Sequence, residues 1–112
     1  MSPTSLGLSS TLDNLAALIA ARADGPADQS YTRQLLDDGV SRCARKLGEE
    51  AIETVVAALG GHQAEITAEA ADLLYHLLVL LQATGVPFDD VLGELARRTR
   101  QSGLQEKASR DR

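Results

Sequence analysis

The sequence predicts an all-α fold: a bundle of four to five helices in a single domain over residues 1–112. Apolar residues recur at the i, i+3, i+4, i+7 spacing of a helix with one buried face, as between Leu12 and Ile19. No segment shows the alternation of apolar and polar residues that marks a half-buried strand. Glycine and proline separate the periodic segments, where helices end. These three observations favour a helical bundle.

Polar caps bound the first two expected helices. Ser10, followed by Asp13 three residues later, resembles a capping arrangement and predicts a helix that continues to the D-G-P run at 24–26. Residues 1–9 are expected to be flexible. After a polar loop, Ser30 is expected to cap a short second helix.

Glycines bound the third and fourth expected helices. Gly39 breaks the chain before a helix at about 40–59, and the G-G pair at 60–61 ends that helix. A long helix follows and continues to about Ala83. It is succeeded by a glycine and a proline, which commonly follow a helix end.

The last expected helix leads into a basic tail. It begins at a cap, Asp89 or Asp90, and continues to about Arg100. Residues 102–112 carry few apolar side chains and are expected to be flexible. Residues 94–112 hold six Lys and Arg against three acids, whereas the rest of the chain holds five against thirteen. An acidic body with a basic tail suits a metal site that also holds a polyanion.

The long fourth helix is apolar on nearly every face. Leucines cover most of its circumference over residues 68–83, whereas Glu69, Asp72 and His76 share one narrow stripe. A helix that is apolar nearly all round is buried, and three short partner helices do not readily cover it. We therefore expect a homodimer in which a second copy completes the core.

Two acidic motifs, E-E-x-x-E and then E-x-x-D, lie on consecutive expected helices. Glu50 with Glu53 and Glu69 with Asp72 form side-by-side pairs, because residues three apart share a helix face. If the helices pack antiparallel the pairs converge, and buried carboxylates need a partner. Oxygen ligands without cysteine favour Mg²⁺ or Mn²⁺ over zinc. The alternative is that these acids are ordinary solvated residues on helix surfaces.

Composition and charge exclude several classes of protein. A net charge of −5 argues against a general nucleic-acid binder. The single cysteine, Cys43, excludes an intrachain disulfide and a cysteine-based zinc site, and we expect it to be a small buried apolar residue. The N-terminus lacks the pattern of a signal peptide, and the apolar run at 73–81 is too short for a membrane span. We expect a cytoplasmic protein without a membrane partner.

Four motifs resemble those of a known enzyme family. They are S-Y-T at 30–32, K-L-G-E-E-A-I-E at 46–53, E-A-A-D-L-L-Y-H-L-L-V-L-L at 69–81 and R-R-x-x-x-S-G-x-x-E-K-A-S-R at 97–110. Together they resemble the all-α, MazG-like nucleotide pyrophosphohydrolases, and within that group the phosphoribosyl-ATP pyrophosphohydrolases of histidine biosynthesis. Some members carry a second, zinc-dependent cyclohydrolase domain, which nothing in this sequence supports.

The resemblance implies hydrolysis of 1-(5-phosphoribosyl)-ATP to 1-(5-phosphoribosyl)-AMP and pyrophosphate, with Mg²⁺ as the cofactor. It implies that Glu50, Glu53, Glu69 and Asp72 are the metal ligands. Glu49 lies on the same side of its helix as Glu53 and is the candidate catalytic base or an outer ligand. A metal ion suits this chemistry because it neutralises polyphosphate charge and lowers the pKa of a bound water.

Other polar residues surround the acidic motifs. Lys46 forms either an ion pair with Glu50, one turn later, or a contact with a substrate phosphate. His76, one turn after Asp72, either orients a metal ligand through a hydrogen bond or is a satisfied core residue. The resemblance adds a group of residues around the basic tail that would bind substrate: Arg97, Arg98, Ser102, Gly103 and Lys107.

Three alternatives remain open at this point. A di-iron carboxylate bundle also places acid pairs inside helices, but it uses Glu-x-x-His, whereas Asp72 follows Glu69 at that spacing. A helical adaptor without enzymatic activity would have acids that are only solvated. A pyrophosphohydrolase of another, non-standard nucleoside triphosphate would share the motifs and differ in its substrate.

Overall fold

The computed structural model describes the backbone of residues 3–26 and 30–100 and, within these ranges, the side chains from Thr11 onward. All the regular elements in these ranges are helices, so the all-α prediction is confirmed. The helices, in chain order, are α1 (Pro3–Arg22), α2 (Tyr31–Asp38), α3 (Val40–Gly60), α4 (Gln63–Thr84) and α5 (Phe88–Thr99).

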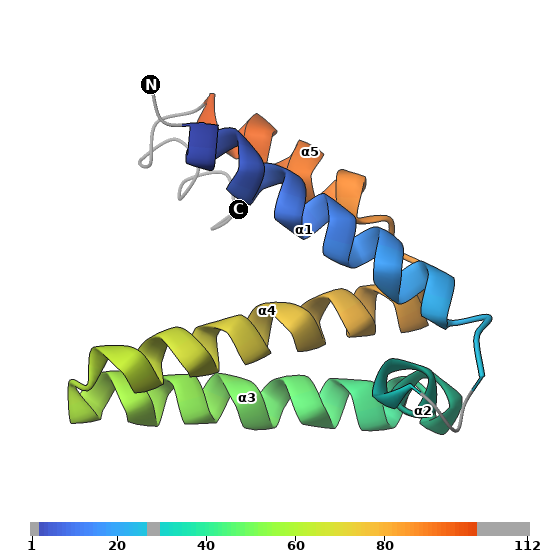
Figure 1. Cartoon of the computed structure of the whole chain (residues 1–112), viewed down its shortest axis with the longest axis horizontal. Helices are drawn as coiled ribbons and strands as arrows, with labels where there is room; N and C mark the ends of the chain where they lie inside the picture. Colours follow the sequence, from blue (N-terminus) through green and yellow to red (C-terminus); the bar gives the residue numbers. More distant parts are fainter. Residues whose placement is uncertain (1–2, 27–29, 101–112) are drawn as a thin grey trace, which may run out of the picture.

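Helices α3 and α4 form a long antiparallel hairpin (Figure 1). Gly61 ends α3 in the left-handed conformation, with a φ of 77°, and its N–H is donated to the carbonyls of Ala57 and Ala58. Glycine adopts this conformation without the steric cost that a Cβ brings. Because α4 begins at Gln63, the turn is tight and the two helices pack along their length. The glycine stop expected at 60–61 is confirmed.

Helix α2 lies across one end of this hairpin, where Figure 1 shows it nearly end-on. The Ser30 hydroxyl accepts a hydrogen bond from the Arg33 N–H at 3.1 Å, which confirms the predicted cap. Arg33 also donates to the Gly25 carbonyl and pairs with Asp37 at 2.8 Å. The bond to Gly25 joins α2 to the segment before it, whereas the pair with Asp37 lies within α2.

The buried core lies where α1, α2, α3 and α4 meet. Its residues are at most 4% exposed and come from all four helices: Ile19, Leu35, Cys43, Leu78 and Val79. The prediction that Cys43 is a buried apolar residue is confirmed, and its thiol donates to the Leu35 carbonyl at 3.3 Å. The core therefore secures the end of the hairpin that carries α2.

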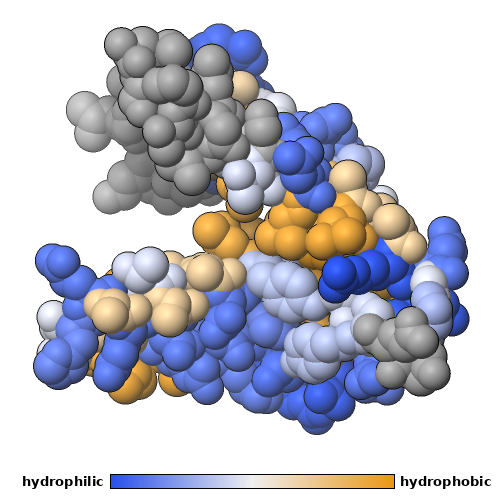
Figure 2. Space-filling model, viewed as in Figure 1, coloured by the Kyte–Doolittle hydropathy of each residue, from blue (hydrophilic) through white to orange (hydrophobic). Residues whose placement is uncertain are grey.

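The rest of the chain is open. Helices α1 and α5 project away from the hairpin, and Figure 2 shows apolar side chains gathered where these helices meet it. The radius of gyration is 16.3 Å, compared with about 13 Å for a compact domain of this length. The expectation that α4 is buried nearly all round is wrong within a single chain, since Leu74 is 44% exposed. Its N-terminal half packs against α3 alone.

Two helix boundaries differ from those expected. Helix α1 begins at Pro3 rather than Ser10, so the segment expected to be flexible before Ser10 is helical from Pro3 onward. Proline suits the first turn of a helix, where its missing N–H has no partner to lose. Pro87 is the N-cap of α5, and neither Asp89 nor Asp90 caps it through its side chain. Both acids lie in the first turn, where they complement the helix dipole.

No single helix in the described part of the chain is long and apolar enough to cross a bilayer. Helices α4 and α5 meet the length and composition requirement only as a pair, and that pair is bent by 114°.

Two glycine substitutions should have opposite effects on stability. Gly61→Ala should lower the free energy of unfolding by about 1 kcal/mol, because alanine is strained at positive φ. Gly48→Ala, inside α3 with no atom within 4 Å of the added Cβ, should raise it by about 0.5–1 kcal/mol. Urea unfolding measures both. A loss of stability in Gly48→Ala would show that another surface packs closely against this part of α3.

Candidate metal centre

Three carboxylates converge between α3 and α4. Glu50 on α3 and Glu69 and Asp72 on α4 each place one oxygen within 4.8 Å of the others. Oxygens that share one Mg²⁺ ion lie about 3–4 Å apart, because each is about 2.1 Å from the metal. Small side-chain rotations therefore suffice for these three residues, here called the carboxylate cluster, to hold one divalent cation.

A threonine holds the two helices together at the level of the carboxylate cluster. The Thr54 hydroxyl donates to the carbonyl of Glu50, one turn earlier on α3, at 2.8 Å. It also donates to the Glu69 carbonyl on α4 at 3.2 Å. This bridge fixes the register of the hairpin where the acids meet. The role of Thr54 has no signal in the sequence, since a threonine within a helix usually bonds only within its own helix.

The acids of the cluster differ in exposure. Glu50 is only 7% exposed, whereas Glu69 is half-buried and Asp72 is exposed. The expectation that the α4 acids are buried is thus wrong for Asp72, because among the described helices only α3 packs beside this half of α4. The nearest cation is the Lys46 ammonium, 4.0 Å from a Glu50 oxygen. At that distance Lys46 offsets only part of the negative charge.

Buried polar atoms without hydrogen-bond partners among the described residues lie in the carboxylate cluster and on His76. Within the described residues, three buried side-chain atoms lack a hydrogen-bond partner: Oε2 of Glu50, Oε2 of Glu69 and Nε2 of His76. Leaving a buried polar atom unsatisfied costs about 1–3 kcal/mol, and more for a charged one. Two of the three are oxygens of the carboxylate cluster. A bound cation would satisfy both, so the donor set fits a divalent metal.

Crowding of the carboxylates raises the pKa of Glu69. The pKa of Glu69 is raised to about 7 by a hydrogen bond shared with Glu53, by burial, and by repulsion from Glu53, Glu50 and Asp72. Glu53 is therefore in contact with the cluster through Glu69, although it is not one of the three converging acids. Its expected role as a ligand remains a prediction.

Two further predicted residues lie at the edge of the site. Glu49 is exposed and points toward Lys46, whose ammonium is 4.0 Å from a Glu49 oxygen. It is one residue from Glu50 but does not join the converging acids. Its expected role as the base is therefore still a prediction, as is the phosphate contact expected of Lys46.

His76 is buried and contacts the backbone rather than a carboxylate. Its Nδ1 lies 2.8 Å from the Asp72 carbonyl, which can only accept, so Nδ1 carries the proton. The hydrogen bond stabilises the turn that presents Asp72. His76 thus contacts the Asp72 backbone rather than a carboxylate, and its predicted role in orienting a metal ligand remains a prediction.

Two of the predicted substrate residues, Arg97 and Arg98, are described by the structure and are not assembled with the carboxylate cluster. Arg97 and Arg98 lie on α5, which projects away from the hairpin, and both pair with Glu94 (Figure 1). Hydrogen bonds from Arg97, the larger cause, and from Arg98 lower the pKa of Glu94 to about 2. Three further predicted residues lie outside the described part of the chain: Ser102, Gly103 and Lys107.

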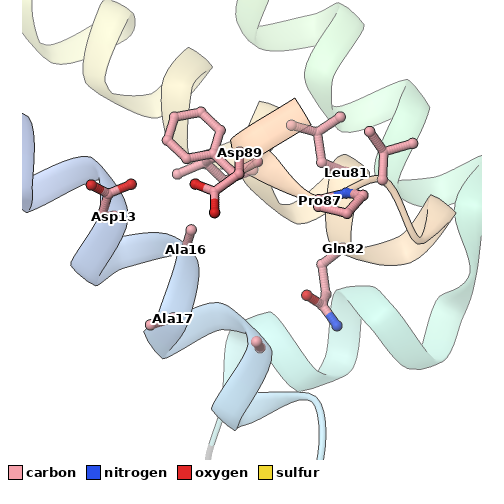
Figure 3. Close-up of a pocket in the computed structure, with 11 residues that line it drawn as sticks. Asp13, Ala16, Ala17, Leu81, Gln82, Pro87 and Asp89 are labelled. Atoms are coloured by element: carbon pink, nitrogen blue, oxygen red, sulfur yellow. The ribbon is translucent and has the colours of Figure 1, made fainter. Parts of the chain in front are cut away.

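A separate cavity of about 530 Å³ lies between α1 and the start of α5. Figure 3 shows the carboxylates of Asp13 and Asp89 at its opening. Its other lining residues are apolar except Gln82, and none is basic. A polyphosphate would be repelled there, so this cavity does not compete with the hairpin as the site for an anionic substrate.

An all-α fold with a carboxylate-only cluster between two antiparallel helices defines a class of helical proteins that can hold a divalent cation. The model of the phosphoribosyl-ATP pyrophosphohydrolase family matches residues 12–99. The chain belongs to this family, which confirms the resemblance drawn from its motifs.

Curated relatives support the same membership over nearly the whole chain. A protein of Azorhizobium caulinodans is 62% identical over 91% of this chain and 94% of its own length. One of Nitrobacter winogradskyi is 56% identical over 91% and 88%, and one of Rhizorhabdus wittichii is 53% identical over 92% and 97%. Each is named phosphoribosyl-ATP pyrophosphatase.

The affinity for Mg²⁺ should rise with pH through about 7. The raised pKa of Glu69 means that the folded, metal-free protein binds a proton more tightly than the unfolded chain does. Its contribution to stability is therefore present below the unfolded pKa of about 4.5 and is lost as pH rises toward about 7. A cation must displace this proton.

Calorimetric titration with Mg²⁺ at about pH 6 and about pH 8, in buffers of different ionisation enthalpy, measures the affinity and the proton released. Glu69→Gln removes the titrating group and serves as the control for proton release. Equal affinity at both pH values, without proton release, would contradict the assignment of Glu69 to the metal centre.

Proposed function

We propose that this protein hydrolyses 1-(5-phosphoribosyl)-ATP to 1-(5-phosphoribosyl)-AMP and pyrophosphate, the second step of histidine biosynthesis, in the cytoplasm. The observation that carries the proposal is the carboxylate cluster, in which one buried oxygen of Glu50 and one of Glu69 have no hydrogen-bond partner among the described residues. Its support from comparison is membership of the phosphoribosyl-ATP pyrophosphohydrolase family and relatives that bear this name.

The proposed cofactor is Mg²⁺, for which Mn²⁺ can substitute because both prefer oxygen ligands. Glu50, Glu69 and Asp72 would hold the ion, with Glu53 as a further ligand once Glu69 has lost its proton. When bound, the ion supplies charge neutralisation for the polyphosphate and a water of lowered pKa.

The surrounding residues have separate proposed tasks. Lys46, beside Glu50, would contact a substrate phosphate, since its ammonium is the cation that the structure places nearest to a carboxylate of the cluster. Glu49 is exposed next to Lys46 and would accept the proton of the attacking water. His76 would keep the Asp72 turn in place through its Nδ1 hydrogen bond. Arg97 and Arg98 lie apart from the cluster in this structure and would contribute positive charge only if α5 moved toward the bound substrate.

We also propose that the protein is a homodimer. The outer face of the C-terminal half of α3 is strongly apolar yet uncovered: Ile52 is 66% exposed, Val56 62% and Leu59 84%. A monomer seldom exposes a contiguous patch of this kind. A second copy would cover it by packing hairpin against hairpin, which gives a four-helix core.

Loss of a cluster carboxylate should abolish turnover without unfolding the protein. Glu50→Gln and Asp72→Asn each remove a metal ligand and also relieve repulsion between neighbouring acids, worth about 0.2–0.5 kcal/mol per pair. We expect no pyrophosphate release from phosphoribosyl-ATP, with an unchanged or higher melting temperature in the absence of metal.

Glu65→Gln is the matched control, because Glu65 is an exposed acid of α4 outside the carboxylate cluster. It should retain wild-type turnover. The same pyrophosphate assay, run on a panel of other nucleoside triphosphates, tests the substrate. Wild-type turnover in Glu50→Gln or Asp72→Asn would falsify the metal centre.

The proposed dimer should depend on the apolar face of α3. Leu59→Asp places a charge on the most exposed residue of that face and should convert the dimer to a monomer. Sedimentation velocity at micromolar concentration measures the change. If the unmutated protein sediments as a fully active monomer, the dimer proposal is wrong.

A further inference from the structure

Both tyrosines of the chain lie against His76, which follows Asp72 of the carboxylate cluster by one helical turn. The sequence holds two tyrosines, one phenylalanine and no tryptophan. Tyr31 on α2 stacks on Tyr75 on α4, with ring centroids 6.5 Å apart and an interplanar angle of 18°. The His76 ring meets both edge-on, at 6.3 Å from Tyr31 and 5.0 Å from Tyr75. These three residues are called the aromatic shelf below.

The aromatic shelf is rigid on its inner side and open on its outer side. The hydroxyl of Tyr75 is hydrogen-bonded to that of Thr32, which fixes the inner ring. Tyr31 is the first residue of α2 and stacks on this fixed ring, yet it is 48% exposed. Core packing uses Tyr75 and not Tyr31. A half-exposed ring held in a fixed orientation is suited to stacking on a planar ligand.

The order of groups along the hairpin matches that of a nucleotide. Lys46 lies one turn before Glu50 on α3, and His76 lies one turn after Asp72 on α4. From the carboxylates toward α2, the groups are therefore first Lys46, Tyr75 and His76, and then Tyr31 at the start of α2. A nucleotide whose phosphates lie at the carboxylate cluster has its ribose next and its base beyond, in the same direction.

We propose that the aromatic shelf binds the purine base of the substrate, with the ring of Tyr31 stacked on the base. This inference rests on the proposed function, which places a purine nucleoside triphosphate at the carboxylate cluster. A base offers its π-face to an aromatic ring, and such stacking contributes substantially to nucleotide affinity. The buried Nε2 of His76, without a partner among the described residues, marks this end of the site as one where an added donor would improve hydrogen bonding.

The test separates base binding from phosphate binding. Tyr31→Leu keeps an apolar side chain but removes the ring, whereas Tyr31→Phe keeps the ring. Leu18→Ala, at 45% exposure on α1, is the control for loss of an exposed apolar residue. Each variant is titrated, with Mg²⁺, with the unreactive α,β-methylene analogue of ATP and with inorganic tripolyphosphate, which lacks a base.

We expect Tyr31→Leu to weaken binding of the ATP analogue at least about fivefold, the lower end of the contribution of one stacked base. Its Kd for tripolyphosphate should stay within about twofold of the wild type, and its melting temperature and sedimentation should be unchanged. Tyr31→Phe and Leu18→Ala should bind both probes as the wild type does.

Three results would overturn the proposal. One is unchanged binding of the ATP analogue by Tyr31→Leu. Another is an equal loss for both probes, which would place Tyr31 at the phosphates. The third is a changed sedimentation coefficient without a change in nucleotide binding, which would make Tyr31 an interface residue. An inactive wild type would refute the proposed function while leaving this binding comparison intact.

Discussion

Repulsion among carboxylates held between α3 and α4 is the constraint on which the rest of the structure depends. One oxygen each of Glu50, Glu69 and Asp72 lies within 4.8 Å of the others, and among the described ion pairs Lys46 alone offsets a charge of this cluster. Isolated helices would separate under such repulsion. The hairpin keeps them together because Gly61 allows a tight return and Thr54 joins the two backbones at the level of the acids.

Without a metal ion, the hairpin therefore holds negative charge that is only partly neutralised, and a bound cation would neutralise it. Protonation of Glu69, whose pKa is raised mainly by its hydrogen bond with Glu53, would remove part of this negative charge. A divalent cation is more effective, because it satisfies several oxygens at once. The same crowding that opposes folding thus brings together oxygens that could bind a metal ion.

The hairpin carries the carboxylate cluster, whereas α1 and α5 extend away from it, and the position of the buried core explains this division. The buried core secures only the α2 end of the hairpin, whereas the other end presents the exposed apolar face of α3. Helices α1 and α5 extend away from the hairpin and leave this face uncovered (Figure 1). An assembly with a second copy would bury the face without changing the carboxylate cluster, which is complete within one chain.

Local rules in the sequence determined most of the helices and the chemistry of the site. Helical periodicity, the Ser30 cap and the glycine pair at 60–61 predicted α2, α3 and the length of α4, since caps and glycines act within a few residues. The spacing of the acids placed Glu50, Glu69 and Asp72 on facing sides of two helices. The start of α1 and the cap of α5 were missed, because helix ends are the least specified by local signals.

Only the tertiary structure decided how these residues differ from one another. The spacing of Glu50, Glu53, Glu69 and Asp72 in the sequence does not distinguish them. Packing nevertheless buries Glu50, leaves Asp72 exposed and places Glu53 where it raises the pKa of Glu69. The bridge from Thr54 and the pairing of the two tyrosines link residues from different helices, which no periodicity within one helix can encode. Sequence determines which side of a helix a residue occupies, whereas the neighbouring helix determines its solvent and its partners.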